Sequence, residues 1–274
     1  MNSQDPISIF KELLDGSSYE LRKAIERGIL RAFARRDLTM IYHYISMISE
    51  NFSGGDLDYT AEDYYKSYKE KPRVKLPKPI ESSSTDLFHV ILARRSRRRY
   101  SKESISLEEL STILYYSVGI SGKAWWGGPK RVYPSAGALQ PVEAYVVASR
   151  VRDLDEGLYH YNPGEHSLEL LREGDFSREL SSIALDQDFI RDAAASVVLT
   201  IVYRRTASRY GLRSYKYSHL DTGFAGQNLY LVVEALKLAT VAVGAFYDER
   251  LCRFLEIDCE EEMPALIFPI GKRL

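Results

Sequence analysis

The feature that most constrains the fold is an alternation of helix and strand patterns from residue 86 onward. Ser106 and Glu109 form a capping box before a helical row of apolar residues, which ends at Gly119. Residues 142–148 are apolar enough for a buried strand, and the β-branched residues at 197–203 favour a central strand. These patterns predict helices packed on a sheet.

The second half of this region extends the pattern. Two short apolar runs, 158–161 and 168–171, flank the turn residues 162–164 and predict a hairpin. A long helix is expected over 219–238, where Gly223 and Gly226 would let another backbone approach closely. Further strands are expected at 241–246 and 266–270. A sheet that is mixed or antiparallel and flanked by helices is an α+β fold.

The chain divides into three parts by composition. Residues 1–52 have a helical apolar spacing and predict a helical N-terminal segment. Residues 53–85 are rich in Gly, Asp, Lys, Pro and Ser and predict an extended linker. Tyrosines within that range indicate that part of it packs on a surface. Residues 86–274, with their alternating helix and strand patterns, are expected to form the main folded domain.

The overall composition excludes several classes of protein. An apolar fraction of 45% and a charged fraction of 27% are those of an ordinary globular chain. A formal net charge of -1 gives no bias toward nucleic acid or acidic lipid. No apolar run is long enough to span a membrane, and residues 1–12 show no secretory pattern, so a cytoplasmic protein is expected. Cys252 and Cys259 lack metal-ligand spacing, so neither a metal site nor a thiol mechanism is expected.

Five arginines surround one serine at residues 94–99. The guanidinium groups of Arg94, Arg95 and Arg98 and the hydroxyl of Ser96 are suited to binding a phosphate. The alternative is a solvated basic patch or a nucleic-acid contact.

Small residues fill the loop at 133–141, directly before a predicted strand. They would leave backbone N–H groups accessible to a planar or anionic ligand, with Ser135 and Gln140 as polar contacts. A plain connecting loop is the alternative.

Lys216 and Tyr217 are adjacent before the long helix. An ammonium group lowers the pKa of a neighbouring phenol and favours its use as a base. An incidental surface pair is the alternative, since the chain contains 20 tyrosines. Gly244 at a strand end and the basic pair Lys272 and Arg273 could face a flat, phosphate-bearing ligand, or serve structure alone.

Taken in order, these segments resemble the nitroreductase superfamily, and within it the SagB-type dehydrogenases, a branch that includes azoline oxidases. The matching stretches are ARRSRRRYSKESISLEEL, YPSAGALQPVEAYVV, GLYHYNPGEHSLELL, RYGLRSYKYSHLDTGFAGQNLYLVVEALKLATVAVGAF and FPIGK. They span residues 86–272. No family motif is recognised in the first 85 residues, and Gln140 stands where SagB-type members often carry an aromatic residue.

The resemblance implies a three-layer α/β/α sandwich around a mixed, mainly antiparallel sheet, with FMN bound between the subunits of an obligate homodimer. Arg94, Ser96 and Arg98, helped by Arg95, would hold the FMN phosphate and ribityl chain, and Lys272 and Arg273 would complete that pocket. The loop of Pro134, Ser135, Ala136 and Gly137 would lie against the flavin from the partner chain, with Gln140 hydrogen-bonding nearby. The backbone of Val243, Gly244 and Ala245 would face the flavin N5 edge.

The resemblance also implies the chemistry. In azoline-oxidising members a Lys-Tyr pair serves catalysis, and Lys216 and Tyr217 match it, with Tyr217 as the base. A peptide-linked or small heterocycle would lose a hydride to flavin N5. The enzymatic alternative is an NAD(P)H-dependent reductase of nitroaromatics or quinones, which can draw protons from solvent. Neither a nucleic-acid nor a membrane partner is expected.

Overall fold

The computed structural model describes residues 27–28, 30–31, 38–45, 64–81 and 85–274. The chain divides into two compact units, one of Tyr59–Thr206 with Lys216–Leu274 and one of Met1–Asp58 with Ala207–Tyr215. In the smaller unit, α3 (Leu38–Ile45) contributes Tyr42, whose hydroxyl donates to the Leu212 carbonyl at 3.3 Å. Most of the helical segment expected at 1–52 lies outside the described residues.

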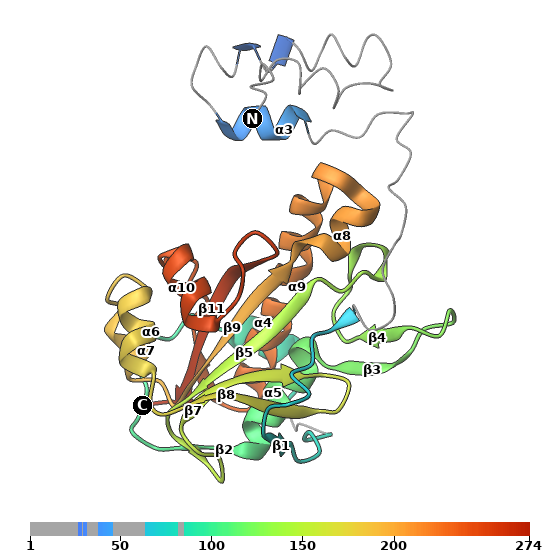
Figure 1. Cartoon of the computed structure of the whole chain (residues 1–274). Helices are drawn as coiled ribbons and strands as arrows, with labels where there is room; N and C mark the ends of the chain where they lie inside the picture. The colour runs from blue at the N-terminus through green and yellow to red at the C-terminus, as the bar shows by residue number, and fades with distance from the viewer. Residues whose placement is uncertain (1–26, 29, 32–37, 46–63, 82–84) are drawn as a thin grey trace. The chain divides into compact units, whose positions relative to one another are not determined.

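A seven-stranded sheet forms the centre of the larger unit (Figure 1). In spatial order its strands are β1 (Arg73–Lys75), β8 (Ser167–Glu173), β7 (Gly157–Asn162), β5 (Val142–Ala148), β9 (Ala195–Val202), β11 (Glu262–Lys272) and β10 (Leu238–Thr240). Every neighbouring pair in this sheet is antiparallel. Two smaller pairs lie outside it, the parallel β2 (Ile105–Ser106) with β6 (Val151–Arg152), and the hairpin of β3 (Ile120–Lys123) with β4 (Pro129–Arg131).

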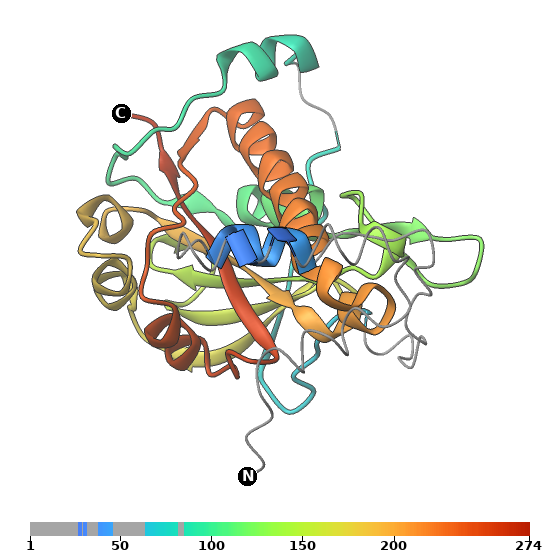
Figure 2. The same cartoon turned by 90° about the horizontal axis from the view of Figure 1, so that it is seen from above.

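Helices cover both faces of the sheet (Figures 1 and 2). One face packs against α5 (Leu107–Val118) and α9 (Ser214–Ala235), and the other against α6 (Ser177–Ile183), α7 (Asp188–Arg191) and α10 (Asp248–Leu255). Side chains of β5 alternate between the two cores, because successive residues of a strand point to opposite faces. The three-layer α+β architecture is therefore confirmed.

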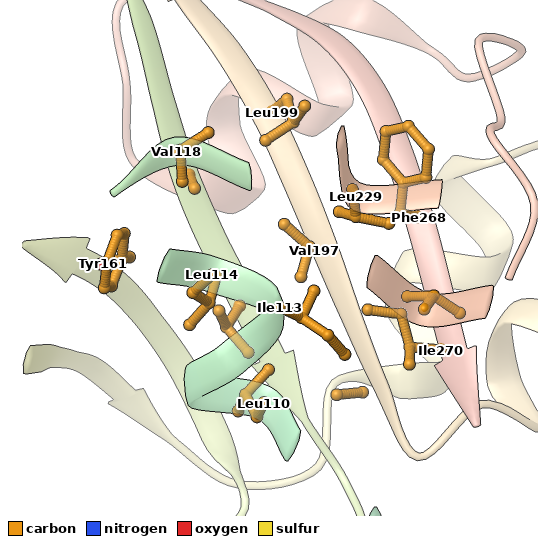
Figure 3. Packing of buried hydrophobic residues seen from close by; sticks show 14 of the residues in the cluster. Leu110, Ile113, Leu114, Val118, Tyr161, Val197, Leu199, Leu229, Phe268 and Ile270 are labelled. Carbon is orange, nitrogen blue, oxygen red and sulfur yellow. The ribbon is translucent and has the colours of Figure 1, made fainter. Parts of the chain in front are cut away.

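The larger core lies under α5 and α9 (Figure 3). Ile113 and Leu114 of α5, Leu229 of α9 and Phe268 of β11 are buried almost completely. Each such side chain contributes about 1.5–3 kcal/mol when it leaves water. This packing fixes α9 firmly against the sheet, which matters because α9 carries most of the contacts described below.

The predicted start of α5 is confirmed in detail. The Ser106 hydroxyl accepts from the Glu109 amide at 3.1 Å, and the Glu109 carboxylate accepts from the Ser106 amide at 2.8 Å. At the other end, Gly119 allows a close turn, since an added Cβ would lie 2.4 Å from the Tyr115 carbonyl oxygen. Both ends of this helix follow from local sequence.

Three sequence predictions differ from the structure. The strand expected at 241–246 is wrong: the strand is Leu238–Thr240, and beyond it only Val243 bridges Ile267. The reason is that Lys237 adopts a left-handed turn (φ 57°), which brings the chain back onto the sheet early. The long helix begins at Ser214 and ends at Ala235, and β11 extends over Glu262–Lys272.

Part of the range expected as linker packs on the sheet. β1 (Arg73–Lys75) pairs with β8, and the preceding residues lie over the sheet, where Lys66 forms an ion pair with Glu262 (2.6 Å). Tyr64, Tyr65 and Tyr68 are half-buried, as their residue type suggested.

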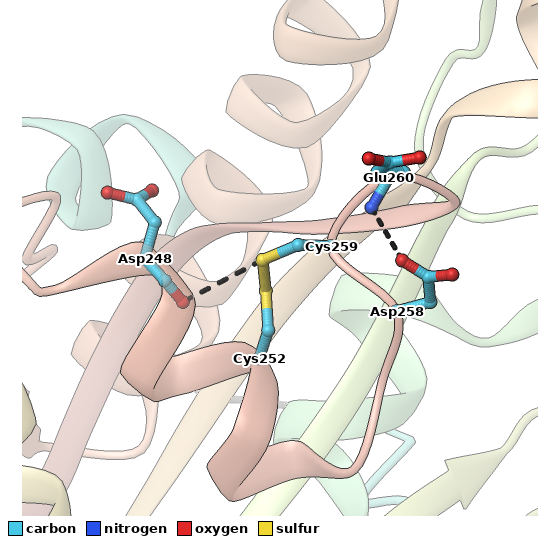
Figure 4. The surroundings of a disulfide bond; sticks show 5 residues. All are labelled: Asp248, Cys252, Asp258, Cys259 and Glu260. Atoms are coloured by element: carbon cyan, nitrogen blue, oxygen red, sulfur yellow. Dashed lines mark hydrogen bonds between the residues drawn. A yellow bond between two sulfur atoms is a disulfide. The ribbon is translucent and has the colours of Figure 1, made fainter.

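The two cysteines form a disulfide that the sequence analysis did not foresee (Figure 4). It joins Cys252 on α10 to Cys259 in the segment before β11, with the Cα atoms 5.7 Å apart. The Cys259 sulfur lies 3.9 Å from the Asp248 carbonyl oxygen at the start of the same helix. The bond closes a short loop beside the sheet's second core.

Candidate active site

The loop at 133–141 adopts an unusual backbone conformation. Its centre is the short 3-10 turn η2 (Ala136–Ala138), in which Gly137 and Ala138 have φ values of 59° and 56°. Gln140 is also left-handed, with φ of 53°. Left-handed residues other than glycine are disfavoured by about 1–2 kcal/mol each, and such strain concentrates at functional sites. The loop must therefore be held in shape by its surroundings.

Asp221 on α9 holds this loop. The Ser135 hydroxyl donates to its carboxylate at 2.7 Å, and the Ala136 amide donates to both carboxylate oxygens at 3.2 Å. The Gln140 amide donates to the Ser135 hydroxyl at 2.8 Å, so the bonds reach both ends of the loop. Asp221 is only 2% exposed, and burial raises its pKa to about 6 despite the bonds from Ser135 and Ala136, which lower it.

The Gln140 side chain points into the protein. It is 2% exposed; its oxygen accepts from Arg131 Nε at 3.2 Å, and its nitrogen donates to the Pro129 carbonyl. A cavity of about 300 Å³ borders the loop, lined by Ser135 and Gln140 on one side and by Trp126 of the β3–β4 turn on the other. The structure thus places a tryptophan beside this loop.

The arginine segment lies at the other half of α9. Ser96 shares a hydrogen bond with the Tyr230 hydroxyl (3.0 Å), and the Arg94 guanidinium stacks over the Tyr230 ring at 5.0 Å. Arg98 lies 5.9 Å from the Phe189 ring, and Arg95 donates to backbone carbonyls of its own segment. In the part of the chain that the structure describes, no carboxylate forms an ion pair with Arg94, Arg95 or Arg98.

The segment of Val243, Gly244 and Ala245 joins the arginines through Tyr230, whose hydroxyl also accepts from the Ala242 amide at 2.7 Å. Val243 exchanges backbone bonds with Ile267. Gly244 is exposed, and a Cβ added there would meet only Leu266, at 4.0 Å. This backbone can accept a flat ring at close range.

Lys272 and Arg273 lie beside the arginine segment, since Tyr100 forms a bridge with Arg273. The Lys272 amine forms an ion pair with Glu109 (2.5 Å). Arg273 pairs with Glu234 of α9 (2.8 Å) and donates to the Leu238 carbonyl. Both predicted phosphate ligands thus already have intramolecular partners.

The structure therefore gathers the predicted residues into two groups on α9. The loop group is attached through Asp221, and the arginine group, which includes Val243–Ala245 and the C-terminal pair, is attached through Tyr230 and Glu234. Tyr230 follows Asp221 by nine positions, which is about 13.5 Å along a helix. Within one chain the two groups therefore contact opposite halves of the same helix.

Lys216 and Tyr217 lie near the loop group. Both are half-buried in the first turn of α9, and Tyr217 precedes Asp221 by one helical turn, about 6 Å. The predicted catalytic pair therefore lies at the same half of α9 as the predicted flavin loop.

A buried charged cluster connects the sheet to this loop. His160 lies between the carboxylates of Glu143 (3.1 Å) and Glu169 (2.9 Å), and Arg205 bonds both Glu143 (2.5 Å) and the Gln140 carbonyl (3.0 Å). Burial lowers the pKa of His160, but its bonds to the two carboxylates outweigh this and raise it. Burial raises the pKa of Glu143, yet Arg205 and His160 together bring it to about 2. Through Arg205 the cluster is hydrogen-bonded to the end of the loop.

Sequence reasoning missed Asp221, Tyr230 and Glu234. All three lie inside a helix, where a lone acid or tyrosine gives no signal of its own. Glu143 and His160 were also missed, because their contact depends on strand register. Within the described residues, no set of three His, Cys, Asp or Glu side chains is arranged to hold a metal ion, and no helix has the length and hydrophobicity of a membrane span.

Comparison with known proteins decides the family. The model of the nitroreductase family matches residues 91–272, a range that contains both groups except Arg273. The chain belongs to the nitroreductase family. It is accordingly an oxidoreductase enzyme.

Individual relatives agree with this membership. A Methanocaldococcus jannaschii protein named as a nitroreductase is 37% identical over 185 residues, which cover 68% of this chain and 90% of that protein. The microcin B17-processing protein McbC of Escherichia coli is 23% identical over 146 residues, covering 52% and 54% of the two chains. A crystal structure of an Anabaena variabilis protein named as a nitroreductase superposes with a TM-score of 0.70 at 26% identity, over 87% of this nitroreductase-family chain and 47% of that one.

Proposed function

We propose that this protein is an FMN-dependent oxidoreductase that works as a homodimer, with each flavin bound by the arginine group of one protomer and the loop group of its partner. The observation that carries the proposal is the position of the two groups on opposite halves of α9. A two-fold axis crossing the middle of this helix would place the first half of one copy against the second half of the other. Two complete sites would result.

The arginine group fits the phosphate and ribityl chain of FMN. Among the described residues no carboxylate forms an ion pair with Arg94, Arg95 or Arg98, and the exposed Ser96 adds a hydroxyl. Guanidinium forks match the oxygens of a phosphate. Lys272 would bind the phosphate only by leaving Glu109, so its contribution is the smaller one.

Exposed apolar side chains support the dimer. On α4 (Leu87–Ala93), Phe88 and Leu92 are 74% and 75% exposed, and on α9 Phe224 is 46% exposed. Nothing within 4 Å would meet a Cβ at Gly223, beside Phe224, so a second backbone can approach there. Apolar patches of this kind mark protein contacts.

We further propose that the reaction is a SagB-type dehydrogenation of a peptide-linked or small heterocycle. When bound, FMN supplies a hydride acceptor at N5. Tyr217 takes the proton released from the neighbouring ring carbon, and Lys216 stabilises the phenolate that this requires. Similarity to McbC, a processing protein of microcin B17, favours a peptide-linked substrate.

The alternative is an NAD(P)H-dependent nitroreductase or quinone reductase. Its support is the similarity to the Methanocaldococcus jannaschii protein, which is named as a nitroreductase. In that case Lys216 and Tyr217 would have no required role, because protons come from solvent.

The visible absorption spectrum of the purified protein tests the cofactor. A two-banded flavin spectrum, with FMN near one per chain after heat release, is expected. A colourless protein that FMN cannot reconstitute would overturn the proposal. Anaerobic mixing then separates the two reactions: a thiazoline-containing peptide should bleach the flavin of a dehydrogenase, whereas NADPH should bleach that of a reductase.

A further inference from the structure

Asp221 is a buried carboxylate with an unusual set of partners. It is 2% exposed, and its hydrogen bonds come from the Ser135 hydroxyl and the Ala136 amide. Among the described residues no Lys, Arg or His forms an ion pair with it, and no cation contributes to its pKa. Burial of an unpaired carboxylate is costly, so a chain that needed only to fold would do better with an apolar or amide side chain here.

The bonds of Asp221 act on a strained part of the chain. Ala138 and Gln140 adopt left-handed conformations that residues with a Cβ disfavour, and Ser135 passes the restraint from Asp221 to the Gln140 amide at 2.8 Å. Without the carboxylate, the donors of Ser135 and Ala136 lose their acceptor and the strain is released by a change of loop shape. Asp221 is therefore coupled to the conformation of the whole segment.

We propose that Asp221 is a positioning residue whose ionised carboxylate holds the loop in the shape that meets the flavin, and whose protonation releases Ser135 and weakens FMN binding. The inference deepens the proposed function and rests on it for the identity of the ligand. In the dimer this loop serves the partner's flavin, so the carboxylate of one protomer acts on the cofactor of the other.

The charged and titratable groups around Asp221 come from the loop side and from α9 itself, where exposed His219 lies two residues before it. On the loop side, Tyr133 interacts with it, and burial raises the pKa of Tyr133 to about 12, so that phenol stays neutral. Arg131 and Arg205 lower the pKa of Tyr133, but burial outweighs them. On the helix itself, Lys216 and Tyr217 lie one turn earlier. Because burial raises the pKa of Asp221 to about 6, its release is expected near that pH.

The first test follows the loop without any flavin. Trp125 and Trp126 are the chain's two tryptophans, and Trp126 lines the cavity beside Ser135, Ala138 and Gln140. In the flavin-free W125F protein, Trp126 emission should shift with a midpoint near pH 6. The shift should be absent from W125F/D221N. Emission that titrates equally in both proteins, or in neither, would overturn the inference.

The second test measures FMN affinity by fluorescence titration at about pH 5 and about pH 8. Because the FMN phosphate itself takes up a proton near about pH 6, both proteins should bind more weakly at the lower pH, but the wild-type dissociation constant should rise about tenfold more than that of D221N. At the higher pH, D221N should bind about tenfold more weakly than wild type. Thr222→Val is the matched control, since Thr222 is equally buried on α9 but bonds only to the Ser218 carbonyl of its own helix. It should follow wild type.

The outcomes separate the two proposals. A protein that binds FMN, but whose D221N variant keeps wild-type affinity and pH dependence, contradicts the role of Asp221 and leaves the proposed function standing. A wild-type protein that binds no FMN at any pH overturns the proposed function, while the Trp126 emission still decides whether Asp221 controls the loop. Should D221N fail to fold, Ser135→Ala removes the middle of the same chain of bonds and should abolish the same pH response.

Discussion

The two halves of α9 hold their parts of the site in opposite ways. In the second half Glu234 forms ion pairs with Arg97 (2.6 Å) and Arg273 (2.8 Å), so its charge is compensated twice. In the first half Asp221 binds the loop at 133–141 through neutral donors alone. The second half of the helix therefore binds two arginines through ion pairs, whereas the first half binds a strained loop through hydrogen bonds. Under the proposed function, each half alone supplies an incomplete flavin site.

The largest expected effect concerns Lys216 and Tyr217, the proposed catalytic pair in the first half. Replacing both Lys216 and Tyr217, as K216A/Y217F, should lower kcat by about 10²–10⁴-fold with FMN still bound, because the proton acceptor is lost. Steady-state oxidation of a thiazoline peptide is the measurement. Tyr215→Phe, at the exposed neighbouring tyrosine, is the control. Unchanged turnover in the double variant would remove the pair from the mechanism and favour the reductase.

The next effect concerns the surface that would join the two halves between chains. Phe224→Asp places a charge on the exposed face of α9 and should yield a monomer that binds FMN at least about tenfold more weakly. Light scattering and flavin titration measure this. Leu185→Asp is matched in exposure, since Leu185 and Phe224 are both 46% exposed, and should change neither property. A monomeric F224D protein with full FMN affinity would show that one chain suffices.

A smaller effect distinguishes the two carboxylates by stability. Glu234→Gln leaves Arg97 and Arg273 without a charged partner and should lower the free energy of unfolding by about 1–3 kcal/mol. Asp221→Asn removes an uncompensated buried charge and should leave the free energy of unfolding unchanged or raise it. Urea denaturation of the flavin-free proteins compares them. Equal destabilisation would mean that the two carboxylates stabilise the fold to the same extent, which contradicts the difference between the two halves.

The smallest effect is in pH dependence. The pKa of Asp221 is raised to about 6, so the folded protein binds this proton more tightly than the unfolded chain, and stability should fall as pH rises from about 4 to about 6. The pKa of Glu143 is lowered to about 2. The stabilisation of the fold by its ionised carboxylate is therefore fully present above the ordinary pKa of 4.5 and is lost as pH falls toward about 2. Melting temperatures measured against pH test this. D221N should lose only the change between about pH 4 and about pH 6, and E143Q only the change toward about pH 2.

Much of the fold could be predicted because its signals are local. The capping box at Ser106 and the turn after Asn162 depend on residues that are neighbours in sequence, and the strand at 142–148 is apolar apart from Glu143. The strand predicted at 241–246 was wrong, because an apolar segment can lie at the edge of a sheet without forming a strand. The left-handed turn at Lys237, which apolar composition does not reveal, makes the strand begin earlier.

The site was only partly accessible to the same reasoning. The small residues at 135–137 and the arginines at 94–98 stood out by type. Asp221 did not, because its meaning comes from a contact with Ser135, 86 positions away. The separation of the two groups along α9 is likewise a property of the folded chain. Long-range contacts of this kind leave no pattern in a single sequence.

The central claim, that each flavin is shared between chains, can be tested in a mixed dimer. One chain carries R94A/R98A, which damages the arginine group, and the other carries Gly137→Val, which cannot keep the left-handed turn at φ 59°. Each variant alone should bind no FMN. The doubly tagged heterodimer has one site with both defects and one with neither, so it should bind about one FMN per dimer. A heterodimer without FMN would contradict the account, since that is the result for a site built from a single chain.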